Sequence, residues 1–332
     1  MDAVLQTKCD QLIENYHRML PGNRLESSSL LVAGAGMFLA KGVEVDPERL
    51  KECKRLLKKR KSVFSSFRGI TEFVVRCKMA LSDDPEAYLE QLDAVFRGLK
   101  SIYRGNQILL AAMVIVDLAA PAEHAAVIQK TRSLYKDMRK AHPWLTSEED
   151  MPFAALMAVT GRDAASVYED AEKAYEILKK DLRASSESRQ MLSHILSIYR
   201  GSAERKCDKI RLIAEGLKRT KHPMGRDRYI SMLGVLCTAS PTPEDLVGMI
   251  GEADDYLRQS KPFRGLFGVG VSCRRMVAVQ MTESVLNDNG MSGVADTAAV
   301  ASMVSTSIEV TIITLILLYS LIVTSSSASS HR

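Results

Sequence analysis

The chain has 332 residues, of which 46% are hydrophobic, 6% aromatic and 26% charged, and its net charge is +5. This length suits two ordinary domains or one elongated array. The low aromatic content favours helices packed through Leu, Ala and Met over a β-sandwich. The mild positive charge argues against a nucleic-acid partner.

The first segment, residues 1–26, is predicted to form an amphipathic helix that caps the rest of the chain. Its apolar residues recur three and four positions apart, which is the helical period. They are Leu5, Leu12, Ile13, Tyr16 and Leu20. The start, MDAVLQTKCD, lacks the apolar core of a signal peptide, so we expect a cytoplasmic protein.

A basic helix is predicted at residues 51–61. Leu50, Cys53, Leu56 and Leu57 supply its buried stripe. A solvated outer face is the ordinary explanation of such charges, and an anionic membrane surface is the alternative partner. The cations of this basic surface are Lys51, Lys54, Arg55, Lys58, Lys59, Arg60 and Lys61.

An internal repeat dominates the region 27–290. Similar helix-like segments end near Leu99, Met138, Leu178, Leu217 and Leu257, at spacings of 39, 40, 39 and 40 residues. A constant period of this length is the signature of stacked helical units that cannot bury their apolar faces alone. The period lies nearest to that of HEAT and armadillo repeats, about 40–47 residues.

Each unit reads as helix A, a turn and helix B. The A segments, such as 153–159 and 192–198, are apolar on most sides and should lie inside. The B segments carry one apolar stripe and should lie outside. We therefore expect an all-α array of helical hairpins, arranged as an α/α superhelix, with a closed α/α ring as the alternative.

The C-terminal region is predicted to differ from the repeats. Residues 291–308 form a small-residue linker or helix, 309–324 a hydrophobic segment and 325–332 a polar tail. Residues 310–324, VTIITLILLYSLIVT, carry no charge and lie near the minimum length of a membrane span. A C-terminal membrane anchor and a helix packed on the array are both open.

Several motifs across residues 5–285 resemble one known family. They are KECKRLLKKRK at 51–61, SSFRG at 65–69, MALSDDPE at 79–86, HPWLTSEED at 142–150, FAAL at 153–156, LSHIL at 192–196, GSAERKCDKI at 201–210 and DDYL at 254–257. The chain resembles a bacterial family of unknown function, DUF4003. The resemblance implies a cytoplasmic, all-helical protein and carries no chemistry with it.

A polar cluster at 142–150 is the first candidate site. His142, Glu149 and Asp150 are residue types that serve in metal or acid/base sites. The run also fits a helix start, because Thr146 with Glu149, or Ser147 with Asp150, would make a capping box and acidic residues favour the first turn. We expect capping to be its role.

His194 is the second candidate. It lies inside a helix A, where the matching positions of the flanking units hold the small residues Ala155 and Gly234. A buried His is usually a core residue with a satisfied partner. If the helices close into a ring, however, a polar pocket around His194 would be the place for an active site.

From the sequence we expect a helical-repeat scaffold that binds a protein or peptide partner. No catalytic order of residues is present, and neither a cofactor nor a metal site is predicted. The alternative is an α/α-ring enzyme that uses His194.

Overall fold

The computed structural model describes residues 1–59, 70–100, 107–264 and 268–288, and the regular elements within them are all helices. The all-α prediction is therefore confirmed. The α-helices are α1 Ala3–Met19, α2 Ser28–Ala40, α3 Pro47–Lys59, α4 Ile70–Leu81, α5 Pro85–Lys100, α6 Gln107–Leu118, α7 His124–Ala141, α8 Met151–Ala158, α9 Ala164–Asp181, α10 Ser186–Ile198, α11 Ala203–Lys218, α12 Pro243–Gln259 and α13 Val271–Asp288. The 3-10 helices are η2 Pro121–Glu123, η3 Glu148–Asp150, η4 Arg228–Leu236 and η5 Lys261–Phe263.

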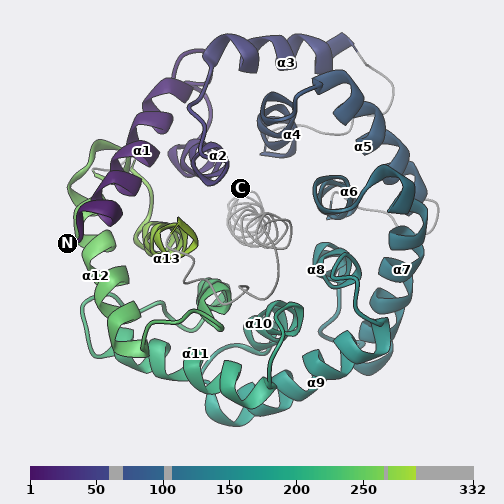
Figure 1. Ribbon diagram of the computed structural model, residues 1–332, viewed down its shortest axis with the longest axis vertical. Coiled ribbons are helices and arrows are strands. Elements are labelled where there is room, and N and C mark those ends of the chain that lie inside the picture. The colour runs from purple at the N-terminus through teal and green to yellow at the C-terminus, as the bar shows by residue number, and fades with distance from the viewer. Residues whose placement is uncertain (60–69, 101–106, 265–267, 289–332) are drawn as a thin grey trace, which may run out of the picture.

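These helices form two concentric layers of a ring (Figure 1). The outer layer contains α1, α3, α5, α7, α9, α11 and α12, and the inner layer contains α2, α4, α6, α8, α10, η4 and α13. Successive outer and inner helices pack as pairs, for example α1 with α2, α5 with α6 and α9 with α10. The predicted helical hairpins are thus present.

The two ends of the array meet. Helix α1 packs against α12 and α13, and α2 packs against α13 (Figure 1). At this seam the amide of Gln280 donates to the carbonyl oxygen of Gly36 at 3.3 Å, and Lys8 forms an ion pair with Asp288 at 2.7 Å. The described helices therefore form the closed ring that was the alternative arrangement, and not an open superhelix.

The repeat positions explain why the outer helices pack inward. Leu99, Met138, Leu178, Leu217 and Leu257 lie in five different outer helices, and each is at most 1% exposed. Two inner helices are buried on all sides: α8 is buried throughout, and α2 is buried from Leu30 to Leu39. Helices without a polar face are stable only in such an interior.

One inner element departs from the predicted α-helix. Residues 228–236 form the 3-10 helix η4. Gly234 lies against α10, where an added Cβ would come within 2.7 Å of Ile195 Cγ2 and 3.0 Å of Leu192 Cδ1. The small residue at this repeat position is therefore required by the close approach of two inner elements.

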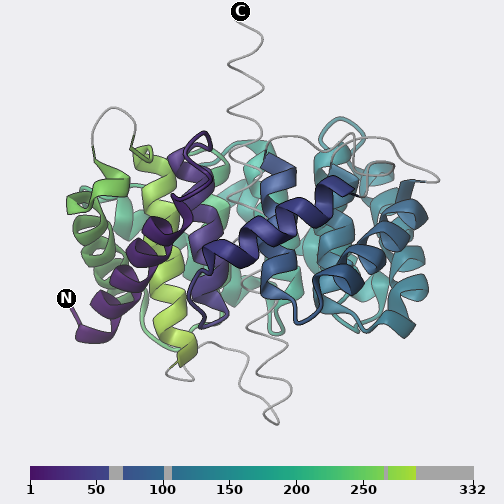
Figure 2. The ribbon, with the colours of Figure 1, turned by 90° about the horizontal axis from the view of Figure 1, so that it is seen from above.

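The alternation of outer and inner helices gives the ring two different faces. Outer helices such as α1 and α3 run toward one face, the upper one in Figure 2, and because outer and inner helices alternate along the chain, the described links from outer to inner helices lie on that face. We call the links on that face the outer-to-inner connections; those described in full are 20–27, 142–150, 182–185 and 219–227. The opposite face carries the inner-to-outer connections.

The predicted segments 291–308, 309–324 and 325–332 lie outside the described residues, as do Arg60 and Lys61 of the basic surface. Helix α1, in the segment predicted as a cap, serves as the outer partner of α2. Among the described helices, none combines the length and the apolar character that crossing a bilayer requires.

Candidate functional site

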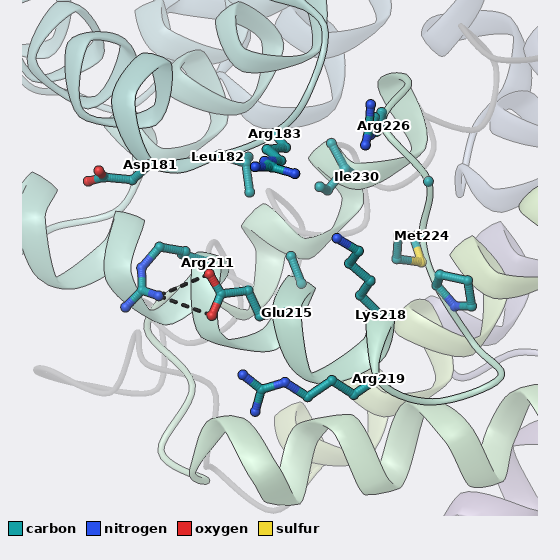
Figure 3. Close-up of a pocket in the computed structure, with 13 residues that line it drawn as sticks. Asp181, Leu182, Arg183, Arg211, Glu215, Lys218, Arg219, Met224, Arg226 and Ile230 are labelled. Atoms are coloured by element: carbon teal, nitrogen blue, oxygen red, sulfur yellow. Dashed lines mark hydrogen bonds and ion pairs between the residues drawn. The ribbon is translucent and has the colours of Figure 1, made fainter.

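A cavity of about 650 Å³ opens on the outer surface of the ring between α9, α11 and the connection to η4 (Figure 3). Its walls combine basic side chains with an apolar floor. The lining residues are Asp181, Leu182, Arg183, Arg211, Ala214, Glu215, Lys218, Arg219, Pro223, Met224, Gly225, Arg226 and Ile230.

The floor forms because two helices end beside each other. Helix α9 ends at Asp181. The next residue, Leu182, has an extended backbone and a buried side chain. After α11, Gly225 adopts a φ of +82°, a left-handed conformation that suits glycine, beside the buried Met224. The backbone N–H of Ser185 donates to the carbonyl oxygen of Arg226 at 3.0 Å and ties the two connections together.

Most of the positive charge around this cavity is uncompensated. Arg211 is held by Glu215 at 3.1 Å and by Asp208 at 2.6 Å. The other four cations are exposed and form no ion pair with any described carboxylate. They are Arg183, Lys218, Arg219 and Arg226. In Figure 3, Arg183 and Arg226 lie beside Ile230, away from the Arg211–Glu215 pair.

Two smaller hollows continue the cavity at its ends. One, of about 430 Å³, shares Arg183 and Arg226 with it. The other, of about 510 Å³, shares Asp181, Leu182 and Arg211 and runs on between α9 and α11. We call the three together the basic trough; its basic end lies at the outer-to-inner connections.

Charges at the other end of the basic trough are balanced. Lys173 forms an ion pair with Glu204 at 2.7 Å, and Glu176 pairs with Lys179 at 3.4 Å. The trough therefore has a direction, with positive charge concentrated around Arg183 and Arg226.

The structure brings two of the four predicted site residues together. His194 Nδ1 lies 3.9 Å from Asp150 Oδ1, which is too far for a hydrogen bond. Among the described groups, His194 Nδ1 has no hydrogen-bond partner, and the side chain is 2% exposed beside the ring of Phe153. Ser147 N donates to Asp150 Oδ2 at 2.9 Å in the expected capping box.

Burial moves the pKa values of this pair in opposite directions. Desolvation lowers the pKa of His194 to about 3, and the nearby charge of His142 acts in the same direction. Desolvation also raises the pKa of Asp150 to about 7. Because low dielectric disfavours both charged forms, His194 is neutral at pH 7 and lies in the interior.

The remaining sequence candidates lie apart. His142 Nε2 approaches Glu172 Oε2 at 2.9 Å, and its ring packs edge-on against Tyr175. Glu149 lies in η3, where Ser147 caps its backbone N–H. In the described part of the chain, no group of three or more His, Cys, Asp or Glu side chains is placed to hold a metal ion.

The described part of the predicted basic surface lies on the outer helix α3. Of the four residues predicted for its buried stripe, Leu50, Cys53 and Leu57 are buried and Leu56 is half-buried. Lys51 pairs with Glu48 at 2.6 Å, whereas Arg55 and Lys58 are exposed.

None of the candidate site residues identified from the sequence lines the basic trough. Its cations come from three separate segments, around Arg183, Lys218 and Arg226. The local signals are two short basic runs, one of Lys179, Lys180 and Arg183 and one of Lys218, Arg219 and Lys221. Nothing in the linear order shows that Arg183 lies beside Arg226, because that proximity depends on how adjacent hairpins pack.

Comparison with known proteins assigns no activity. A family model described as a protein of unknown function (DUF4003) matches residues 15–317. Neither a curated protein nor a solved structure matches the chain.

Proposed function

The chain belongs to the DUF4003 family, and from that premise we propose that it is a binding module whose basic trough holds an acidic, partly apolar peptide segment of a partner protein. The trough residues described above suggest the chemistry of this partner. The proposal refines the scaffold role expected from the repeats.

Four exposed cations around an apolar floor carry the proposal. Arg183 and Arg226 can each offer a planar pair of N–H donors to a carboxylate, and such charge-assisted pairs are strong and directional. Leu182, Met224 and Ile230 lie beneath them and suit an aliphatic or aromatic side chain. A ligand that satisfies both must be anionic and apolar at once.

The shape of the trough favours an extended peptide over a compact metabolite. It is open to solvent along the groove between α9 and α11, and three hollows share lining residues end to end. Sites for small molecules are usually enclosed and bury most of the ligand. The charge difference between the two ends would set the direction of the bound peptide.

An enzymatic role around His194 has less support. Its side chain is enclosed, and its Nδ1 has no described hydrogen-bond partner within reach. General acid/base catalysis needs a group that reaches the substrate and has a pKa near the working pH. Asp150 has such a pKa but is itself buried.

Fluorescence anisotropy with defined peptides tests the proposal. The probe is a labelled peptide in which Asp and Glu flank a Leu-Phe pair. One control peptide has Lys in place of the acidic residues, and another has Ser in place of Leu-Phe. We expect saturable binding of the first peptide alone, because each control removes one half of the chemistry.

A matched pair of variants locates the site. Arg183→Glu with Arg226→Glu reverses two cations of the trough, and Arg55→Glu with Lys58→Glu reverses two exposed cations of α3. Hydrogen bonds to charged groups contribute about 1.5–3 kcal/mol each, so the trough variant should bind at least tenfold more weakly. Equal affinities of the two variants would exclude the trough as the site.

A further inference from the structure

The two faces of the ring carry opposite charges. Each of the seven outer helices in the described residues has a basic side chain in its last turn, for example Lys140 in α7 and Lys180 in α9. Cations at helix C-termini favour the helix dipole, so this pattern has a structural cause of its own. Since all these ends point to one face, they also make that face basic.

The same charge continues beyond the helix ends. Exposed cations follow the outer helices in the connections themselves, where Glu148 and Asp227 are also exposed. On the opposite face exposed carboxylates outnumber the exposed cations Lys41 and Arg200. The cations that follow the outer helices are Arg24, Arg183, Lys221, Arg226, Lys261 and Arg264. The carboxylates of the opposite face are Glu44, Asp46, Asp83, Asp84, Glu123 and Asp163. Helix capping alone does not require the cations in the connections.

Two large apolar side chains stand fully exposed on the basic face. Leu25, in the connection after α1, is 103% exposed, and Trp144, in the connection after α7, is 97% exposed. On the opposite face the exposed large apolar residues are less exposed: Val43 is 45% exposed, and Met1 and Val4, at the start of α1, are 43% and 40% exposed. Trp is enriched where a protein meets the headgroup layer of a bilayer, because its ring is amphipathic.

We propose that the described parts of the outer-to-inner connections form a docking face that binds the surface of an anionic lipid bilayer. The cations meet lipid phosphates, while Leu25 and Trp144 enter the headgroup layer. Each Lys or Arg near such a surface strengthens binding by roughly fivefold. This face shares Arg183 and Arg226 with the basic trough, whereas Leu25 and Trp144, which distinguish a bilayer from a peptide, lie outside the trough.

This face also carries carboxylates. Glu148 and Glu149 follow Trp144, but they form the first turn of η3 at the capped start of α8, which gives them a structural role. The acidic face of a second copy would also complement the cations. It would not, however, offer an apolar layer to both Leu25 and Trp144, because these residues follow α1 and α7, and the two helices lie on opposite sides of the ring (Figure 1).

The sole tryptophan of the chain makes the test direct. The full chain is titrated with vesicles of phosphatidylcholine alone and with vesicles that also contain phosphatidylglycerol, while Trp144 emission and co-sedimentation are recorded. We expect binding and a blue shift with the anionic vesicles only, both weakened by salt. Brominated lipid should quench the emission.

A matched pair of variants identifies the face. Arg24→Glu with Leu25→Ser changes one cation and one apolar residue on the basic face, and Lys41→Glu with Val43→Ser makes the same changes on the opposite face. The first should bind anionic vesicles at least tenfold more weakly, and the second should bind like the unchanged chain. All four side chains are exposed, so both variants should fold.

Three results would overturn the proposal. The first is no binding to anionic vesicles. The second is binding without a change in Trp144 emission, which would place the contact elsewhere on the chain, including residues 310–324. The third is a shift of Trp144 emission with protein concentration in the absence of lipid, which would identify a second copy as the occupant.

Discussion

The hydroxyl of Tyr256 in α12 donates a hydrogen bond to Asp10 Oδ1 in α1 at 2.6 Å, although 246 positions separate the two residues. Gln6 approaches the same hydroxyl at 3.5 Å. This pair joins the first outer helix to the last and accompanies the packing of α1 on α13. A repeat array normally has two free ends, and here the ends stabilise each other.

Closure predicts that damage at the start of the chain will reach its end. Leu5 in α1 is fully buried, so Leu5→Ala should lower the free energy of unfolding by about 2–5 kcal/mol. Hydrogen exchange should then accelerate in α12 and α13 as well as in α2. In an open array the effect would stay with α2. Leu25→Ala, at an exposed position, should change neither quantity.

A buried ion network links α12 and α13, which pack against α1 where the two ends of the array meet. We expect this network to weaken in acid. Asp254 lies 2.7 Å from His222 Nδ1 and 2.6 Å from Arg274 Nε. Burial raises the pKa of Asp254, but hydrogen bonds from Arg274 and His222 outweigh it and lower the pKa below its ordinary value of 3.8. The stabilisation is therefore complete above pH 3.8 and is lost as the pH falls through the lower folded-state value.

Asp254→Asn tests this network. Breaking a buried pair leaves Arg274 without its charge partner, so the variant should lose about 3–5 kcal/mol at pH 7. Urea unfolding at pH 7 and pH 3 should show a smaller difference for the variant than for the unchanged chain. An identical difference in both proteins would show that Asp254 is not the titrating group.

The buried His194 should contribute its own loss of stability, at a higher pH than the loss due to Asp254. Its pKa is about 3 in the fold, where burial is the main cause, against an ordinary value of 6.5. The contribution of His194 to stability is thus present above pH 6.5 and falls as the pH decreases toward 3, by about 2 kcal/mol between pH 6.5 and 5. The raised pKa of Asp150 acts in the opposite direction over the same interval. His194→Leu should remove the His194 contribution from the pH dependence in urea unfolding. A variant whose stability changes over that interval as it does in the unchanged chain would contradict the assignment.

Two helical glycines should respond differently to alanine. A Cβ at Gly216 in α11 would lie 2.7 Å from Cγ2 of Val247 in α12, whereas a Cβ at Gly248 would meet nothing within 4 Å. Gly248→Ala should raise the midpoint of thermal unfolding, because alanine favours the helix by up to about 1 kcal/mol. Gly216→Ala should lower the midpoint, because the branched Val247 has few alternative rotamers. Equal shifts would mean that α11 and α12 are further apart.

The inner and outer layers of helices could be predicted because apolar residues recur along the sequence at a nearly constant period. Leu99 and its four counterparts are buried in outer helices, and the apolar segments around Phe153 and Leu192 lie in inner ones. Closure was not predictable in the same way, because it depends on a small rotation between neighbouring hairpins that accumulates around the ring. Contacts such as Tyr256 with Asp10 leave no local pattern.

The candidate site was harder to predict than the fold. The sequence indicated His194 and Asp150 through their residue types, and the structure places them near each other but enclosed. It did not indicate Arg183 or Arg226, because they lie in separate segments and nothing in the linear order shows that they are close in space. Basic residues at helix ends are common, and only packing shows which of them surround a cavity.

Hydrogen exchange of the full chain, with and without the acidic Leu-Phe peptide, tests the central claim most directly. If the peptide occupies the basic trough, exchange should slow in the connections 182–185 and 219–227 and remain unchanged in α3 and α10. Slower exchange around His194 in α10, or in α3, with the two connections unaffected, would contradict the account.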